Sequence, residues 1–88
     1  MKVDQFKVFP NPSEGRISIE FKTEKNPTTL LIVDSFGREV FRRDLNNYDG
    51  GVMNLTDIDL SQANKGTLFV VLTQNDGEQK YAERIILK

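Results

Sequence analysis

The sequence of 88 residues contains no cysteine, no histidine and no tryptophan. Without cysteine the chain forms no disulfide and offers no thiolate nucleophile, and without histidine it lacks the commonest general base and a common metal ligand. We therefore exclude thiol chemistry and histidine-dependent triads, and we expect neither an enzyme nor a bound cofactor. The redox compartment stays open, because secreted proteins can also lack cysteine.

An excess of one charge and long hydrophobic runs are also missing. Twelve Lys and Arg residues stand against thirteen Asp and Glu residues, a net charge of −1, so no basic field exists to hold a nucleic acid. The longest apolar runs, residues 30–33 and 68–72, are far shorter than the roughly 20 residues that a membrane-spanning helix needs. We expect no nucleic-acid partner and no membrane insertion.

What the sequence does contain is a series of strand patterns. Residues 16–22 (RISIEFK) alternate strictly, with Ile17, Ile19 and Phe21 on one face, as a half-buried strand requires. Residues 30–33 are apolar on both faces, which is typical of a central strand covered on both sides or lying deep in a sandwich. The sequence predicts strands at residues 6–9, 16–22, 28–34, 38–45, 53–60, 67–74 and 78–88.

Turn signals separate these strands. Gly37 closes a short connection that fits a hairpin, Asp76-Gly77 between two β-rich runs is a strong hairpin signal, and Gly66 ends a turn before the sixth strand. Such turns recur at the spacing of an all-β sandwich. The predicted fold is therefore all-β, a seven-stranded antiparallel β-sandwich of immunoglobulin-like appearance.

Two irregularities are expected along the strands. The apolar positions change phase at Thr56-Asp57, which indicates a β-bulge or the end of pairing. Residues 61–65 have a weak helical tendency, and five residues suffice for a single turn, which we expect to be capped by Ser61.

The segment FPNPSEG, residues 9–15, predicts a stiff corner near the start of the chain. Pro10 and Pro12 each fix φ near −65° and lack a backbone donor, and each pushes the preceding residue towards extended geometry. Asn11 can bond nearby backbone through its side chain, and Gly15 can adopt the left-handed conformation that turns the chain into the next strand. From the residues alone, this is a rigid corner between two sheets.

Several polar and aromatic groups are candidate sites. Asp57 and Asp59 share one strand face and could collect a calcium ion with Asn54 or Asp49. The favoured interpretation is that these side chains simply face solvent, because no EF-hand spacing is present.

Two further groups of residues could bind a ligand, but for both we favour an interpretation in which no ligand is bound. Arg42-Arg43 could hold an anion, but we expect one exposed and one half-buried strand position. Tyr48 and Tyr81, with Phe36 in a loop, could form a sugar-stacking platform. We favour Tyr81 in the core and Tyr48 over a loop.

Four segments together resemble a known family. FPNPSEGRISIEF, LLIVDSFGREVF, NLTDIDLSQANKGTLFVVL and the terminal RIILK are similar, in order and spacing, to the type A C-terminal sorting domain of the type IX secretion system of Bacteroidetes. The resemblance covers residues 8–88, which we take as one sorting domain, and residues 1–7 as the end of a linker and the start of the first strand. One position departs from the family pattern: an aromatic residue usually stands two positions after the glycine of the penultimate strand, where this chain has Leu68, and Phe69 follows.

The resemblance implies a function without catalysis. Such domains follow a cargo protein that has reached the periplasm by its own N-terminal signal, and the outer-membrane translocon recognises them. A sortase-like cysteine protease then typically cuts ahead of the domain, here in or before residues 1–6. The cargo is released outside the cell or joined to the outer-membrane surface.

We hypothesise that two segments form part of the recognised surface. The residues are Pro10, Asn11, Pro12 and Gly15 of the corner and Arg84, Ile85, Ile86, Leu87 and Lys88 of the last strand. The alternative is a generic binding or adhesion β-sandwich, for carbohydrate or protein, appended to a secreted enzyme. The two differ because a sorting domain must end its protein, whereas a binding module can sit anywhere.

Overall fold

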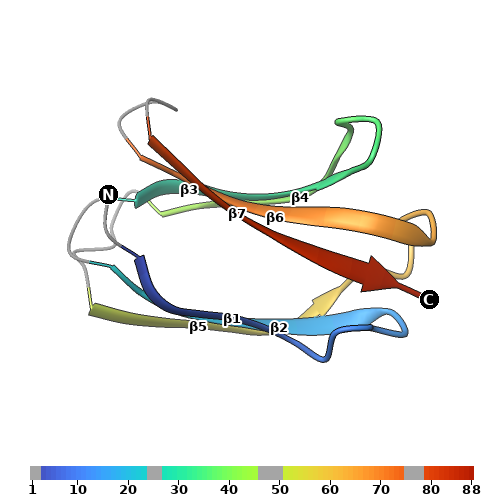
Figure 1. The fold of residues 1–88 in the computed structure, drawn as a ribbon, viewed down its shortest axis with the longest axis horizontal. Coiled ribbons are helices and arrows are strands. Elements are labelled where there is room, and N and C mark those ends of the chain that lie inside the picture. The colour runs from blue at the N-terminus through green and yellow to red at the C-terminus, as the bar shows by residue number, and fades with distance from the viewer. Residues whose placement is uncertain (1–2, 24–26, 46–50, 75–78) are drawn as a thin grey trace.

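The computed structural model describes residues 3–23, 27–45, 51–74 and 79–88, and all regular structure in these residues is β-strand (Figure 1). Three strands form one antiparallel sheet in the order β1-β2-β5, and four form a second in the order β4-β3-β6-β7. The predicted all-β class, strand number and antiparallel pairing are confirmed. The strands are β1 (Val3–Phe9), β2 (Arg16–Thr23), β3 (Pro27–Asp34), β4 (Glu39–Asp44), β5 (Gly51–Asp59), β6 (Gly66–Gln74) and β7 (Gln79–Leu87).

The core lies between the two sheets. Alternating apolar side chains of β2 face those of β3 and β6, as the pleat requires, and Phe21 is completely enclosed. Phe6 of β1 packs on Phe21 at a ring-centroid distance of 5.7 Å and on Tyr81 of β7 at 4.7 Å, which joins the sheets along one side. The buried apolar residues are Ile17, Ile19, Phe21, Leu30, Ile32, Leu45, Leu55, Ile58, Leu60, Leu68, Val70, Leu72, Ile85 and Leu87.

The strand β3 lies in the middle of the four-stranded sheet, but it is not covered on both sides. Leu30 and Ile32 are fully buried, whereas Leu31 and Val33 on the other face are half-buried. Of the two alternatives predicted for this strand, a position inside a sandwich is confirmed, and coverage on both faces is wrong. The described residues form two layers, so the outer face of β3 meets no third layer.

The phase change in β5 is a β-bulge, as predicted. Ile17 pairs with Ile58 and Ile19 with Leu55, so two residues of β5 lie opposite one residue of β2. Asp57, one of those two, has a φ of 55°. The extra residue returns Leu55 and Ile58 to the same buried face despite their odd spacing.

The turn after β5 is a single turn, but its cap is a different residue from the one expected. The Ser61 N–H donates to Oδ1 of Asp59 at 2.8 Å, and the Ala63 N–H donates to the Leu60 carbonyl at 3.0 Å. Asp59 therefore caps the turn, because an aspartate side chain readily accepts from the backbone two residues on. The turn leads to Gly66, which begins β6 with a φ of 125°.

Three of the connections gather at one end of the sandwich. The turns at 10–15, 35–38 and 60–65 lie at the end where β7 finishes, and β1 starts at the opposite end (Figure 1). Of the predicted turn residues, Gly37 has a φ of 84° as a hairpin turn requires. Asp76 and Gly77 fall outside the described residues.

Candidate recognition site

The corner, residues 10–15, joins β1 to β2 within one sheet, so the prediction that it passes between two sheets is wrong. Its backbone lies against the free edge of β7, where Ser13 forms an isolated parallel bridge with Leu87. The Ser13 N–H donates to the Ile86 carbonyl at 2.8 Å, and the Lys88 N–H donates to the Ser13 carbonyl at 2.8 Å. The two segments hypothesised to be recognised are therefore in direct contact.

Asn11 extends this contact along β7 through its side chain. Its Oδ1 accepts from the Ile86 N–H at 3.0 Å, and its Nδ2 donates to the Arg84 carbonyl at 3.4 Å. A neighbouring strand would bond the outward backbone groups of β7 in the same way. The flanking Pro10 and Pro12 have no N–H groups that would need partners, and both of their preceding peptide bonds are cis.

Ser13 anchors the corner from within, a role that was not foreseen. It is fully buried, its Oγ donates to the Arg16 carbonyl at 2.8 Å, and it accepts from the Gly15 N–H at 3.1 Å. Gly15, at a φ of 137°, accepts through its carbonyl from the Leu60 N–H at 2.7 Å. A serine between a proline and a glycine is a common turn residue, but nothing in the sequence indicates that it is buried.

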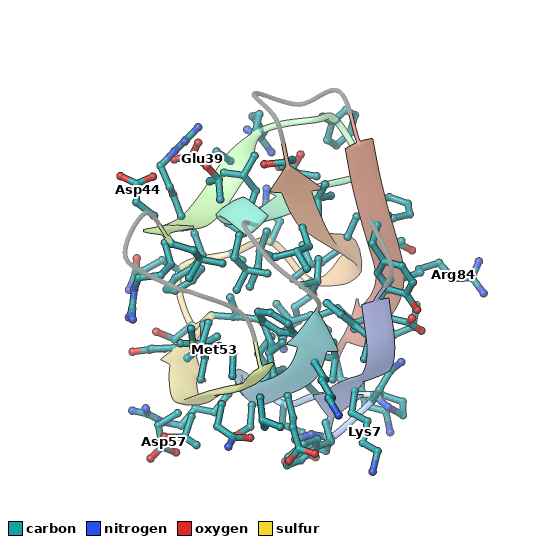
Figure 2. The ribbon with its side chains drawn as sticks, turned by 90° about the vertical axis from the view of Figure 1, so that its left-hand side faces the viewer. Lys7, Glu39, Asp44, Met53, Asp57 and Arg84 are labelled. Atoms are coloured by element: carbon teal, nitrogen blue, oxygen red, sulfur yellow. The ribbon has the colours of Figure 1, made fainter. Side chains whose placement is uncertain are left out.

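The last strand divides its side chains between the core and the surface. Ile85 and Leu87 are buried between the sheets, whereas Arg84, Ile86 and Lys88 are exposed. Arg84 extends away from the body of the sandwich (Figure 2). Two residues of the last strand therefore anchor it in the core, and the side chains of the other three are exposed to solvent.

A shallow hollow of about 600 Å³ opens beside the corner and is lined by charged side chains of both signs and by prolines. Arg16 and Asp59 approach to 4.0 Å there, both more than half exposed, so the pair contributes little to stability. The backbone N–H of Ser61 is the main cause of a lowered pKa at Asp59. The lining residues are Pro10, Pro12, Glu14, Gly15, Arg16, Asp59, Ser61 and Lys88.

At the same end, Asp34 organises the hairpin between β3 and β4. Its Oδ1 accepts from the backbone N–H groups of Phe36 and Arg38, each at 2.9 Å, and its Oδ2 pairs with Arg38 Nε at 2.8 Å. Burial alone would raise the pKa of Asp34, but the hydrogen bonds from Arg38 and Phe36 outweigh it and lower that pKa. The side chain of Phe36 stands 82% exposed on this turn.

The other candidate ligand groups of the described residues lie on β4 and β5. Asp57 points outward (Figure 2), and the described residues contain no group of three or more acidic side chains that could hold a metal ion. Asp49 lies outside the described residues. Arg42 and Arg43 are both exposed, so the expected half-buried position is wrong: Arg42 pairs with Glu39 at 3.0 Å, and Arg43 lies over the Phe41 ring.

The aromatic residues do not gather into a platform within the described part of the chain. Tyr81 packs on Phe6 and contacts the core, as favoured, and Phe36 lies at the other end of the sandwich. Tyr48 lies outside the described residues. In β6 the core position is filled by Leu68, while Phe69 is half-buried on the outer face, and the pairing of β6 with β7 runs without a bulge.

A family model described as the secretion system C-terminal sorting domain matches residues 7–88. The chain belongs to this family, the C-terminal sorting domains of type IX secretion. Membership implies a sorting signal attached to an upstream cargo, and passage of that cargo to the outer membrane or the extracellular surface. No curated protein sequence matches the chain. None of the described residues form a helix that could cross a membrane.

Acid should weaken the β3–β4 hairpin. Because the folded pKa of Asp34 lies below its usual value of 3.8, its charge stabilises the fold above about pH 4 and stops doing so as the pH falls through the lowered value. We expect Asp34→Asn to lower the melting temperature at pH 7, and the difference from the parent protein to shrink below about pH 4. Thermal unfolding followed by circular dichroism measures this, and a difference that is constant with pH would contradict it.

Loss of the Asn11 side chain should open the edge of β7. Asn11→Ala removes the oxygen that accepts the hydrogen bond from the Ile86 N–H. Because such a hydrogen bond stabilises the local structure by about 1 kcal/mol, the Ile86 amide should exchange with solvent roughly fivefold faster in this variant. Asn11→Asp keeps the acceptor oxygen and serves as the matched control. Amide hydrogen exchange by NMR measures both, and equal protection of Ile86 in Asn11→Ala and the parent protein would refute the role of Asn11.

Proposed function

We propose that this domain is the address by which the type IX machinery recognises an upstream cargo protein, and that the corner joined to the end of β7 is the surface that is recognised. The observation that carries the proposal is the set of backbone and Asn11 hydrogen bonds between the corner and β7. They unite residues 75 positions apart in the sequence. The residues proposed to form the surface are Pro10, Asn11, Pro12, Gly15, Arg84, Ile85, Ile86, Leu87 and Lys88.

A surface held in one conformation suits recognition. A receptor that binds it does not have to order a loop first, so less of the binding free energy is lost. Within the surface, Ile85 and Leu87 act from the core by fixing the strand, and Arg84, Ile86 and Lys88 offer side chains to the receptor. Recognition then depends on shape and charge, and the domain needs no reactive group.

The direction of the chain supports the same proposal. Since β1 begins at the end opposite to the recognised surface (Figure 1), a cargo attached there leaves that surface accessible. We propose that residues 8–88 are the sorting domain, that it is exported from the periplasm, and that a sortase-like cysteine protease then cuts in or before residues 1–6. A cut ahead of Val3 would leave β1 and the sandwich whole.

We also propose that the sandwich is immunoglobulin-like. We letter β1, β2 and β3 as A, B and C, letter β4, which pairs with β3, as C′, and letter β5, β6 and β7 as E, F and G. The two sheets then have the strand orders A-B-E and C′-C-F-G. Immunoglobulin domains place A, B and E in one sheet and C, F and G in the other. The order of strands and the aligned antiparallel layers support this arrangement.

The proposed function predicts that residues 1–88 export an unrelated protein. A reporter with an N-terminal export signal, fused ahead of residues 1–88, should reach the surface of a host that has type IX secretion and stay in the periplasm of a secretion-defective strain. Adding Arg84→Glu and Lys88→Glu should lower surface delivery roughly tenfold, because reversed charges at a recognised surface weaken binding by at least about 1.4 kcal/mol. Protease protection of the reporter in intact cells measures delivery.

The matched control is Lys7→Glu combined with Lys22→Glu, an equal double charge reversal at exposed positions of β1 and β2 on the other sheet. It should leave delivery unchanged, and circular dichroism should confirm that all variants are folded. Periplasmic retention of the unmodified fusion in both strains would defeat the sorting function. Full delivery of the doubly reversed variant would defeat the recognised surface while leaving the sorting function in place.

A further inference from the structure

The two outer faces of the sandwich differ in the chemistry of their central strands, although Phe9 and Val52 are exposed on the edge strands of the three-stranded sheet. On β2, at the centre of the three-stranded sheet, the outward positions are polar or charged and include Arg16, Ser18, Glu20 and Lys22. An antiparallel sheet with one solvated face is expected to look like this. The outer face of the four-stranded sheet does not.

On that second face, the outward residues of the two central strands are apolar. Leu31 of β3 pairs with Val71 of β6, and Val33 pairs with Phe69, so that the four side chains form one block. All four are half-buried, and no third layer of the described residues covers them. A continuous apolar block on the surface of a small protein is typical of an interaction site.

The block continues onto the terminal strand β7. Ala82 pairs with Val71, Arg84 pairs with Phe69, and Ile86, which is 38% exposed, follows on the same face. The outward side chains of the terminal segment are therefore part of this face, while its inward ones belong to the core. We call the face formed by Leu31, Val33, Phe69, Val71, Ala82, Arg84 and Ile86 the apolar face.

Arg84 is the charged group that distinguishes this face. None of the ion pairs found among the described residues includes it, whereas Arg42 at the β4 margin is paired with Glu39. Arg84 extends into solvent at the β7 margin (Figure 2). A complementary partner therefore presents a carboxylate beside an apolar patch.

The corner removes one other way of binding at this strand. A partner strand added to β7 would need its outward backbone groups, and the Arg84 carbonyl, both backbone groups of Ile86 and the Lys88 N–H are bonded to Asn11 and Ser13. At the end of β7 a partner must therefore contact side chains. A membrane surface is disfavoured as the occupant, because binding to anionic lipid relies on clusters of several cations, and Arg84 is the one cation among the residues that define the apolar face.

We propose that the apolar face is the docking surface for a protein of the export machinery that presents an apolar patch bordered by an aspartate or glutamate. The identity of this partner as export machinery rests on the proposed function, while the existence of the docking surface does not. The corner fixes the margin of the face at β7, and the block on β3 and β6 supplies the apolar contact.

Site-directed photo-cross-linking in living cells tests the docking surface. A benzophenone amino acid is placed at Ala82, an exposed position of the apolar face, or at Lys22 on the polar face, in the reporter fusion expressed in a host with type IX secretion. We expect illumination to join the fusion to a host protein from position 82, at a yield roughly tenfold above that from position 22. Position 86 provides a second probe if the variant at 82 does not fold.

The chemistry of the partner is tested in the same fusion. Arg84→Glu should reduce the cross-linking yield at position 82 roughly tenfold, because two carboxylates would then face each other. Mass spectrometry of the cross-linked peptide should place an acidic residue beside apolar ones. Equal yields at 82 and 22, adducts with lipid or with a second copy of the fusion in place of a host protein, or a yield unaffected by Arg84→Glu would each overturn the proposal.

Failure of this inference can be told apart from failure of the proposed function. Surface delivery of the reporter without a product specific to position 82 would reject the docking face and leave the sorting function intact. A product specific to position 82, formed by a fusion that is retained in the periplasm of both strains, would reject the sorting function and leave the docking face intact.

Discussion

The structure depends on the contact between the corner and the last strand. Ser13 exchanges two backbone hydrogen bonds with Ile86 and Lys88, and it is itself buried and bonded to Arg16 and Gly15. This contact closes the sandwich on the side of β1 and β7, because the corner follows β1 in one sheet and β7 is the edge of the other. It also gives residues 86–88 a defined position beside the corner.

From this contact follows the way in which the domain can be recognised. An edge strand normally exposes a row of unpaired backbone groups, and here those of the terminal residues are used internally. What remains for a partner is the arrangement of side chains: Arg84, Ile86 and Lys88 outside, Ile85 and Leu87 inside. Buried and exposed side chains alternate along residues 84–88, so the same segment both stabilises the core and forms part of the exposed surface.

Much of the fold could be predicted from the sequence, because its strands carry local signals. The strict alternation of residues 16–22 located β2, the phase change at Thr56-Asp57 located the bulge, and Gly37 located a hairpin. The terminal residues of β1 were harder, since Val3 was placed outside the predicted strand and its pairing depends on distant residues. Asp59 rather than Ser61 caps the turn after β5, because the pairing of β5 with β2 ends at Asp59 and places its side chain at the Ser61 N–H.

The candidate site was predicted as two separate segments. Pro10 to Gly15 was recognised as a stiff corner and Arg84 to Lys88 as a terminal strand, but the sequence gives no measure of their distance. Their meeting depends on the order of strands in two sheets, a non-local property. The apolar outer face was hidden for the same reason: residues 30–33 fitted either a strand covered on both sides or one deep in a sandwich, and only the sheet order reveals which side is open.

The most direct test of the account is an NMR measurement of scalar couplings across hydrogen bonds. The hydrogen bonds of the corner predict couplings from the Ser13 nitrogen to the Ile86 carbonyl carbon and from the Lys88 nitrogen to the Ser13 carbonyl carbon. Absence of both, in spectra that resolve the equivalent couplings between β6 and β7, would contradict the claim that the corner holds the last strand.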